Sequence, residues 1–334
     1  MLTNLPITCL FRLACFLLFT VQRVAGQTEE PIHYKITVPA GVDLVLDGTL
    51  TLPKTLSRKV PVLLLIAGSG PTDRDCNNAY GLKTDAFKML ADSLVRNGIA
   101  VARYDKRGSG TNLKAMQTAL KPETMVFDHY VADAVGIIRQ LQADKRFSGV
   151  IVAGHSEGSL VGMLAASQTK AKGFISIAGA GRNIVDVLKE QGRMAGNPAA
   201  IQAEVDGALD SLRAGQRVHP KNSLLKAQLS PQAQPYLISW MAFDPAAVVK
   251  AYKGPVLIIQ GKKDLQVALA DAEALKAARP DAQLALFDQM NHILKNVEGT
   301  DKAVNFGTYK NPNLPITPGL VPVIVQFITG KAVR

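Results

Sequence analysis

A strand, a tight turn and a helix follow one another within residues 150–162, and this stretch constrains the fold more than any other. Residues 150–153 are apolar and mostly β-branched, the turn reads Gly-His-Ser-Glu-Gly, and small apolar residues at helical spacing follow. A sharp strand-to-helix turn exposes the hydroxyl of Ser156 at the end of a sheet, where a base can activate it. Gly154 and Gly158 are needed because a side chain at either position would meet the neighbouring strand or helix.

Composition limits the class of protein. The chain has 334 residues, of which 47% are hydrophobic and 19% charged, enough for one large α/β domain with an insertion or for two smaller domains. The formal net charge of +11 comes from scattered lysines and arginines, and aromatic residues make up only 6%. A nucleic-acid surface would need clustered cations with stacking residues between them, so we expect no nucleic-acid partner.

The N-terminus has the pattern of a targeting segment. Residues 10–21 are mostly apolar but too few to span a bilayer, and Val24 and Gly26 suit a cleavage site. We therefore expect residues 1–26 to be a signal peptide cut near Gly26, with export to the periplasm or beyond; an uncleaved anchor is the alternative. Cleavage leaves Cys76 as the single cysteine, and no Cys/His spacing predicts a metal site.

Strands and helices alternate along most of the remaining chain. Alternating apolar and polar residues predict an N-terminal antiparallel hairpin from residues 36–38 and 43–52, with its turn at Gly41. A continuous apolar run predicts a buried parallel strand at 60–66, and further strands are predicted at 99–105, 150–153, 174–178, 255–261 and 283–287. Helical spacing follows them at 87–95, 131–141, 160–164, 268–278 and 320–328. This order predicts an α/β fold with a doubly wound, mostly parallel sheet, whose functional loops lie at the carboxyl ends of the strands.

The strand pattern is interrupted between residues 182 and 253. Helical patterns at 184–188, 201–212 and 236–241 predict a helical cap inserted over the site. The chain thus divides into a first core part at 27–181, the cap at 182–253 and a second core part at 254–334. Trp240, with Met241 and Phe243, either lines an acyl pocket or packs the cap down.

A serine nucleophile needs an imidazole base, and the sequence offers two that follow Ser156 in the order typical of hydrolases. His219 lies beside a proline within the cap, whereas His292 follows the strand at 283–287. We therefore predict that His292 is the base. His155 is expected to point away from Ser156 and to serve packing.

A carboxylate should orient that base from a loop after a strand. Asp264 follows the strand at 255–261, and Asp288, close before His292, is the alternative. Asp264 is favoured because the orienting aspartate usually comes from a separate loop.

An oxyanion hole needs two backbone N–H donors. Glu157 follows the nucleophile and supplies the first, and we assign the second to Ser69 in the glycine-containing loop at 67–71. A phosphate-binding loop would need a lysine and an immediate helix, which this loop lacks.

Five motifs in this order resemble the α/β-hydrolase superfamily, most closely its carboxylesterases related to serine aminopeptidases. They are Ala-Gly-Ser-Gly-Pro-Thr-Asp-Arg-Asp at 67–75, Tyr-Asp-Lys-Arg-Gly-Ser-Gly at 104–110, Gly-His-Ser-Glu-Gly at 154–158, Gly-Lys-Lys-Asp-Leu-Gln-Val at 261–267 and Asn-His at 291–292. The resemblance implies an acyl-enzyme mechanism on small esters, without metal or cofactor, in which Ser156, Asp264 and His292 form the triad. The chain departs from the family in having Cys76 where glycine is common, and Ala67-Gly68 where many relatives have His-Gly.

The leading hypothesis is therefore an exported serine carboxylesterase with a small-molecule ester substrate. Arg74 and Arg107 are candidates for binding polar substrate groups near the mouth of the site, or for forming structural ion pairs. Two alternatives remain. A peptidase would need an acidic group such as Glu157 or Glu190 to hold a substrate α-ammonium, and a non-catalytic binding protein would not use the triad.

Overall fold

The computed structural model describes residues 27–37, 43–114, 119 and 121–331. The expected signal peptide at 1–26, its cleavage point at Gly26 and the hairpin turn at Gly41 lie outside these residues. The structure therefore does not test these three predictions.

The described residues contain one eight-stranded sheet with the order β1-β2-β4-β3-β5-β6-β7-β8. Its strands are β1 (Gln27–Thr37), β2 (Asp43–Pro53), β3 (Val60–Ile66), β4 (Ala100–Tyr104), β5 (Phe147–His155), β6 (Gly173–Ile177), β7 (Val256–Gly261) and β8 (Gln283–Phe287). β2 pairs antiparallel with β1 and with β4, and every other neighbouring pair is parallel. The predicted doubly wound, mostly parallel sheet with an N-terminal hairpin is confirmed.

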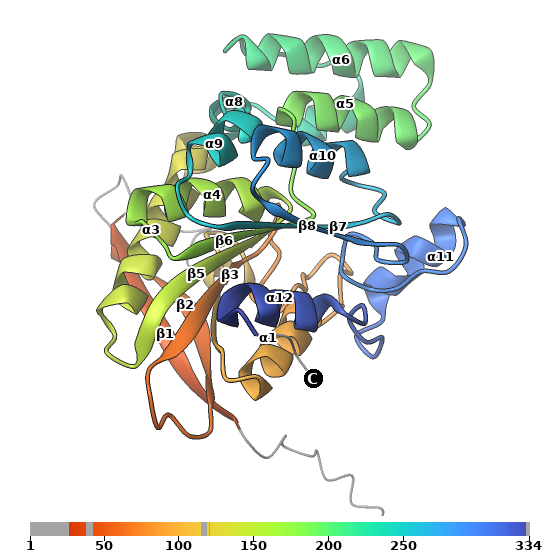
Figure 1. The fold of residues 1–334 in the computed structure, drawn as a ribbon. Helices are drawn as coiled ribbons and strands as arrows, with labels where there is room; N and C mark the ends of the chain where they lie inside the picture. Colours follow the sequence, from red (N-terminus) through yellow and green to blue (C-terminus); the bar gives the residue numbers. More distant parts are fainter. Residues whose placement is uncertain (1–26, 38–42, 115–118, 120, 332–334) are drawn as a thin grey trace, which may run out of the picture.

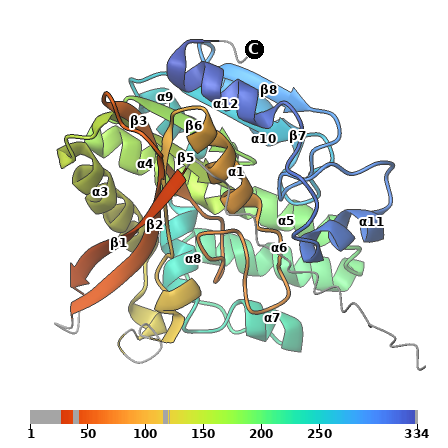
Figure 2. The ribbon, with the colours of Figure 1, turned by 90° about the horizontal axis from the view of Figure 1, so that it is seen from below.

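Helices cover both faces of this sheet (Figure 1). α1 and α12 lie on one face, and α3, α4, α9 and α10 lie on the other, with α5 and α6 stacked beyond them. The hairpin and β8 form opposite edges, as Figure 2 shows from below. The α-helices are α1 (Ala86–Arg96), α3 (Phe127–Ala143), α4 (Glu157–Thr169), α5 (Ile184–Met194), α6 (Ala199–Arg213), α7 (Ser223–Gln228), α8 (Gln234–Met241), α9 (Pro245–Ala251), α10 (Leu269–Ala278), α11 (Lys302–Gly307) and α12 (Leu320–Thr329).

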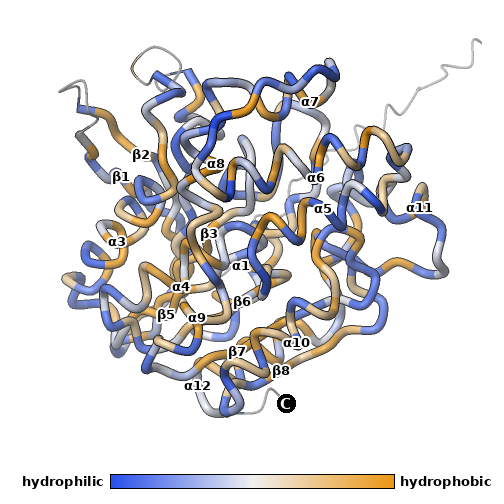
Figure 3. Tube along the Cα trace, turned by 90° about the horizontal axis from the view of Figure 1, so that it is seen from above, coloured by the Kyte–Doolittle hydropathy of each residue, from blue (hydrophilic) through white to orange (hydrophobic). Residues whose placement is uncertain are grey.

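The continuous apolar character of the inner strands follows from this double cover. Successive side chains of a strand point to opposite faces, so both sets must be apolar when helices pack on both sides. In β3, Val62, Leu64 and Ile66 join the core beneath α3 and α4, whereas Leu63 and Leu65 join the core beneath α1 and α12. Figure 3 shows how the core differs from the inserted helices. β7 and α12 are largely hydrophobic, whereas hydrophobic and hydrophilic residues alternate along α5 and α6.

The first strand is longer than the sequence predicted. β1 begins at Gln27 and pairs with β2 along its whole length, whereas only residues 36–38 were expected as strand. Its first residues are polar, and Pro31 lies within it, which is tolerated because β1 is an edge strand with one free side. Because backbone pairing with β2 holds this edge strand, its side chains need no regular apolar pattern, and the sequence gives only a weak signal for it.

The inserted helices α5 to α9 lie between β6 and β7, within the stretch predicted as a cap. The side chain of Asn183 caps α5 by accepting from Val185 N. Its amide donates to the carbonyls of Met241, the last residue of α8, and of Phe243 just beyond it. One asparagine thus fixes the start of the first cap helix to the end of the fourth. Within the described ranges, the structure has no helix of the length and apolarity needed to cross a membrane.

Candidate active site

Ser156 occupies a strained turn between β5 and α4. Its φ of 55° and ψ of −123° are unfavourable for a residue with a side chain. The turn is held because Ser156 N donates to Ile177 O at 2.9 Å, and it is close-packed because a Cβ on Gly154 would overlap the Gly158 carbonyl. Gly158 in turn packs on the backbone of β3 at Ile66. The two glycines therefore have the packing role that the sequence predicted.

His292 and Asp264 meet across two separate loops after β7 and β8. His292 Nδ1 lies 2.8 Å from Asp264 Oδ2, and both side chains are buried. Because a carboxylate only accepts, Nδ1 carries the proton and Nε2 is left able to accept one. Asp288, the alternative carboxylate, is exposed and forms an ion pair with Lys262 instead.

Asp264 is held as a charged group despite its burial. Burial by itself would raise its pKa, but the charge and hydrogen bond of His292 and two backbone N–H groups outweigh it, so the pKa of Asp264 is lowered. The N–H groups are those of Gln266 and Val267, at 2.7 and 2.9 Å from Oδ1. The side-chain amide of Gln260 donates to Oδ2 at 3.2 Å. An ionised carboxylate in this place stabilises a protonated His292.

His155 supports His292 from below. Its Nε2 donates to the His292 carbonyl oxygen at 2.7 Å, and the two rings lie 4.7 Å apart between centroids. The ring of Phe87 packs edge-on at 5.4 Å. Burial, followed by the nearby His292, lowers the pKa of His155 to about 3, so this imidazole stays neutral. His155 therefore packs on Phe87 and holds the backbone of His292. It also lines the cavity that contains Ser156, although the sequence analysis expected it to point away from that serine.

A buried ion pair, which the sequence analysis missed, links the two segments assigned to the oxyanion hole. Lys106 Nζ donates to the Gly68 carbonyl in the loop before Ser69 and lies 3.0 Å from Glu157 Oε1. Glu157 is the first residue of α4, so its N–H has no partner within the helix. This lysine lies in the Tyr-Asp-Lys-Arg-Gly motif, but its partners, Glu157 and the Gly68 carbonyl, are far from it in the sequence.

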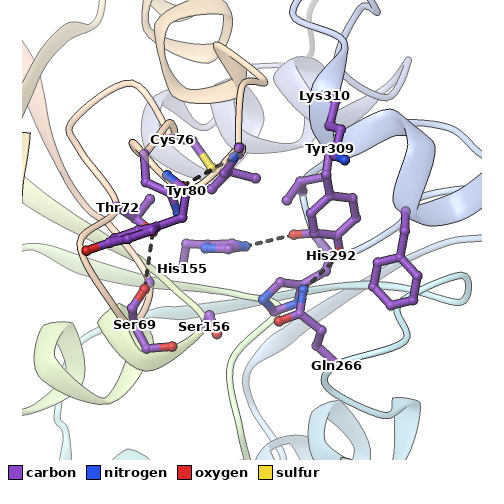
Figure 4. Close-up of a pocket in the computed structure, with 16 residues that line it drawn as sticks. Ser69, Thr72, Cys76, Tyr80, His155, Ser156, Gln266, His292, Tyr309 and Lys310 are labelled. Atoms are coloured by element: carbon purple, nitrogen blue, oxygen red, sulfur yellow. Dashed lines mark hydrogen bonds between the residues drawn. The ribbon is translucent and has the colours of Figure 1, made fainter. Parts of the chain in front are cut away.

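Two cavities meet at Ser156, and Ser69 and Gln266 also line both. The outer cavity, of about 400 Å³, lies on the side of His292 (Figure 4). Its other lining residues include Asn78, Tyr80, His155, Phe306, Tyr309 and Lys310. The cap cavity, of about 120 Å³, lies against the inserted helices. Its other lining residues include Glu157, Leu160, Ile184, Val187, Leu188, Trp240 and Phe243.

The predicted substrate-binding residues separate into two groups. Trp240 lines the cap cavity and also stacks on Phe127, with centroids 5.8 Å apart. Arg74 and Arg107 line neither cavity. Arg74 pairs with Asp105 at 2.7 Å, and the buried Arg107 holds Asp133 through two hydrogen bonds of 2.6 Å. Of the two interpretations kept open for these arginines, the geometry favours structural ion pairs.

The outer wall of the site was missed at the sequence level. α11 and the 3₁₀ turn Thr308–Lys310 were not predicted, yet they bring Phe306, Tyr309 and Lys310 to the cavity. Gln266 donates to the Tyr309 hydroxyl at 2.8 Å and so joins this segment to the loop that carries Asp264. The apolar spacing of this short helix is too brief to be recognised in the sequence.

Cys76 is the residue that stands where the family commonly has glycine. Its φ of 70° is a backbone conformation that glycine adopts at little cost. Its thiol is fully buried, and that burial raises the pKa of Cys76 to about 12, so it is not a reactive nucleophile. In the ranges that the structure describes, no three His, Cys, Asp or Glu side chains gather as a metal site would require.

A family model described as serine aminopeptidase, S33, matches residues 78–297, a segment that contains Ser156, Asp264 and His292. The chain belongs to this family. Esterase EstD of Thermotoga maritima is 30% identical to this S33-family chain over 267 residues, which are 78% of this chain and 61% of that protein. The chain thus matches less than two thirds of that relative's length.

Solved structures agree on the fold of this S33-family chain. Est1E from Butyrivibrio proteoclasticus, with ferulic acid bound, gives a TM-score of 0.53 at 16% identity, covering 84% of this chain and 96% of that one. A puromycin-hydrolysing peptidase of Mycobacterium tuberculosis gives 0.53 at 18% identity, covering 91% and 39%. These similarities show an α/β-hydrolase fold.

Proposed function

We propose that this protein is a serine carboxylesterase that works through an acyl-enzyme intermediate. The observation that carries the proposal is the hydrogen bond of 2.8 Å between His292 Nδ1 and Asp264 Oδ2. The strained, half-buried Ser156 lines the same cavity as His292. The 30% identity to Esterase EstD supports the ester as substrate class.

The proposed reaction has two halves. Ser156 Oγ attacks the ester carbonyl carbon while His292 Nε2 takes its proton, and the carbonyl oxygen becomes an oxyanion. The N–H groups of Ser69 and Glu157 stabilise that oxyanion, each by roughly 3 kcal/mol. The alcohol leaves with the proton from His292. Water then attacks the acyl-serine by the same route, which releases the acid and restores Ser156.

The arrangement disfavours the aminopeptidase alternative. An aminopeptidase places the substrate α-ammonium on the acyl side, where an unpaired carboxylate should receive it. The Glu157 carboxylate is bound to Lys106, and that of Glu190 is bound to Arg182 at 2.5 Å. The cap cavity is lined instead by mainly apolar side chains.

Turnover of p-nitrophenyl acetate and butyrate by the protein and its Ser156→Ala variant tests the proposal. We expect the variant to lose roughly a thousandfold or more in kcat. Faster hydrolysis of aminoacyl anilides than of esters would favour the peptidase. No turnover of either, together with no labelling by a fluorophosphonate, would favour a binding protein.

We also propose that the protein acts after export. The support is the apolar segment and the cleavage pattern ending at Gly26. Recovery of a secreted product whose N-terminus is Gln27 is the expected result, and an intact N-terminus on membrane-bound protein would contradict it.

A further inference from the structure

The two cavities at Ser156 allow the two halves of the substrate to be assigned. This assignment rests on the proposed esterase function. A general acid must reach the oxygen of the departing alcohol, so the leaving group occupies the cavity that His292 lines. The acyl group then lies on the opposite side of Ser156, in the cap cavity, which Glu157 lines and His292 does not.

The cap cavity selects a short acyl group. Its volume of about 120 Å³ is below the roughly 150 Å³ of an apolar cavity that accommodates benzene. Leu160, Ile184, Val187 and Leu188 give it apolar walls, and its cation Arg182 is already paired with Glu190 and Asp271. An acyl chain of about four carbons fills this space, and a long fatty acyl chain exceeds it.

The outer cavity is larger and chemically different. Tyr80 from the loop after β3 and Tyr309 after α11 lie on opposite sides of it (Figure 4). Phe306 adds a third ring, 5.5 Å from that of Tyr309 between centroids. Tyr80 and Phe306 are 80% and 47% exposed, which leaves their faces available to a flat ligand. Aromatic walls of this kind favour an aromatic ligand through stacking.

The outer cavity carries a positive charge, which favours an anionic ligand. Lys310 is exposed at its wall, and no Asp or Glu is among the residues that line it. No ion pair joins Lys310 to a carboxylate in the part of the chain that the structure describes, so its ammonium is available to a ligand. The net charge of +11 favours the approach of anions to the surface as a whole.

We propose that the outer cavity binds an aromatic leaving group that carries a carboxylate, so that the substrates are short-chain acyl esters of phenolic acids. Lys310 pairs with the carboxylate, Tyr80 and Tyr309 contact the ring, and the phenolic oxygen lies toward His292. In this reaction the phenol leaves with the proton from His292, and water later releases the short acid.

The test compares 3-carboxyphenyl acetate with 3-carbamoylphenyl acetate, which has nearly the same shape but no charge. We expect a higher kcat/KM for the anionic ester, by about threefold to fivefold, because an exposed ion pair contributes little more than this. Lys310→Gln should remove this preference for the anionic ester, and Lys310→Glu should reverse it. Lys253→Gln, at an exposed site before β7, removes the same charge and should leave the ratio intact.

The contribution of the ring is tested with phenyl acetate and methyl acetate. Tyr80→Ala should lower the ratio of kcat/KM for phenyl acetate to that for methyl acetate by about threefold or more. Because Tyr80 is exposed, its loss should not unfold the protein, so misfolding would not explain this change. Comparing variants cancels the different reactivities of the leaving groups.

Turnover of p-nitrophenyl acetate separates the two proposals. If the protein hydrolyses this ester through Ser156 but Lys310→Glu does not change the ratio of anionic to neutral ester, the leaving-group assignment is wrong and the esterase function stands. If Ser156 is not needed for any ester, both are wrong.

Discussion

The ammonium of Lys106 lies 3.0 Å from the carboxylate of Glu157, and each of these side chains is only 2% exposed. The same ammonium donates to the Gly68 carbonyl, so one buried cation holds the loop before Ser69 against the start of α4. The two backbone N–H groups proposed for the oxyanion hole therefore keep their spacing through a single side chain.

Breaking this pair should cost stability. Lys106→Met leaves Glu157 buried without its partner, so the free energy of unfolding should fall by about 3–5 kcal/mol. Urea titration measures this. The double variant Lys106→Met with Glu157→Gln should lose less than the single variant, because no uncompensated charge remains. Equal losses would mean that the pair matters only through packing.

The orientation of His292 can be tested at its carboxylate. Asp264→Asn removes the acceptor that keeps the proton on Nδ1, so kcat on p-nitrophenyl acetate should fall by about four orders of magnitude with little change in KM. Asp288→Asn is the matched control, because that side chain is exposed and paired with Lys262. A large loss in the control, with none at Asp264, would reassign the orienting role.

Stability should fall on acidification because of His155. In the unfolded chain this imidazole takes up a proton near pH 6.5, whereas in the folded protein its pKa is about 3. Between these values the unfolded state binds more protons, so acid favours it, by about 2 kcal/mol between pH 7 and pH 5.

Urea midpoints at both pH values provide the measurement. His155→Gln, which retains an N–H donor, should reduce this pH dependence. His219→Gln, at an exposed site in the cap, should retain it. An unchanged pH dependence in His155→Gln would show that other groups cause it.

The size of the cap cavity should set the acyl preference. In a series of p-nitrophenyl esters, kcat/KM should fall beyond butyrate, and Leu188→Ala should move the optimum to longer chains because it enlarges the cavity. Trp240→Ala is less suitable, since Trp240 also stacks on Phe127. Leu286→Ala, at an exposed position of β8, should leave the profile unchanged. An unaltered optimum in Leu188→Ala would place the acyl group elsewhere.

Much of this molecule could be predicted because the relevant signals are local. The turn at Ser156 is determined by residues within a few positions, since Gly154 and Gly158 are the residues that its sterics require. The strands β3 and β8 were predicted with their observed bounds. In β3 the signal is a continuous apolar run, which reports burial on both faces directly. The loops after the strands then narrowed the candidate base and carboxylate to a few positions.

Only the tertiary structure decided what surrounds Ser156. Tyr80, Gln266 and Lys310 are far apart in the sequence and line one cavity only because three loops converge at the carboxyl edge of the sheet. The partners of Arg74 and Arg107 were equally beyond the sequence, since a guanidinium binds whichever carboxylate the fold brings within reach. Strand, turn and helix patterns express short-range sterics and burial, which the sequence alone determined here. Cavity shape and charge pairing depend on long-range packing, which only the folded chain reveals.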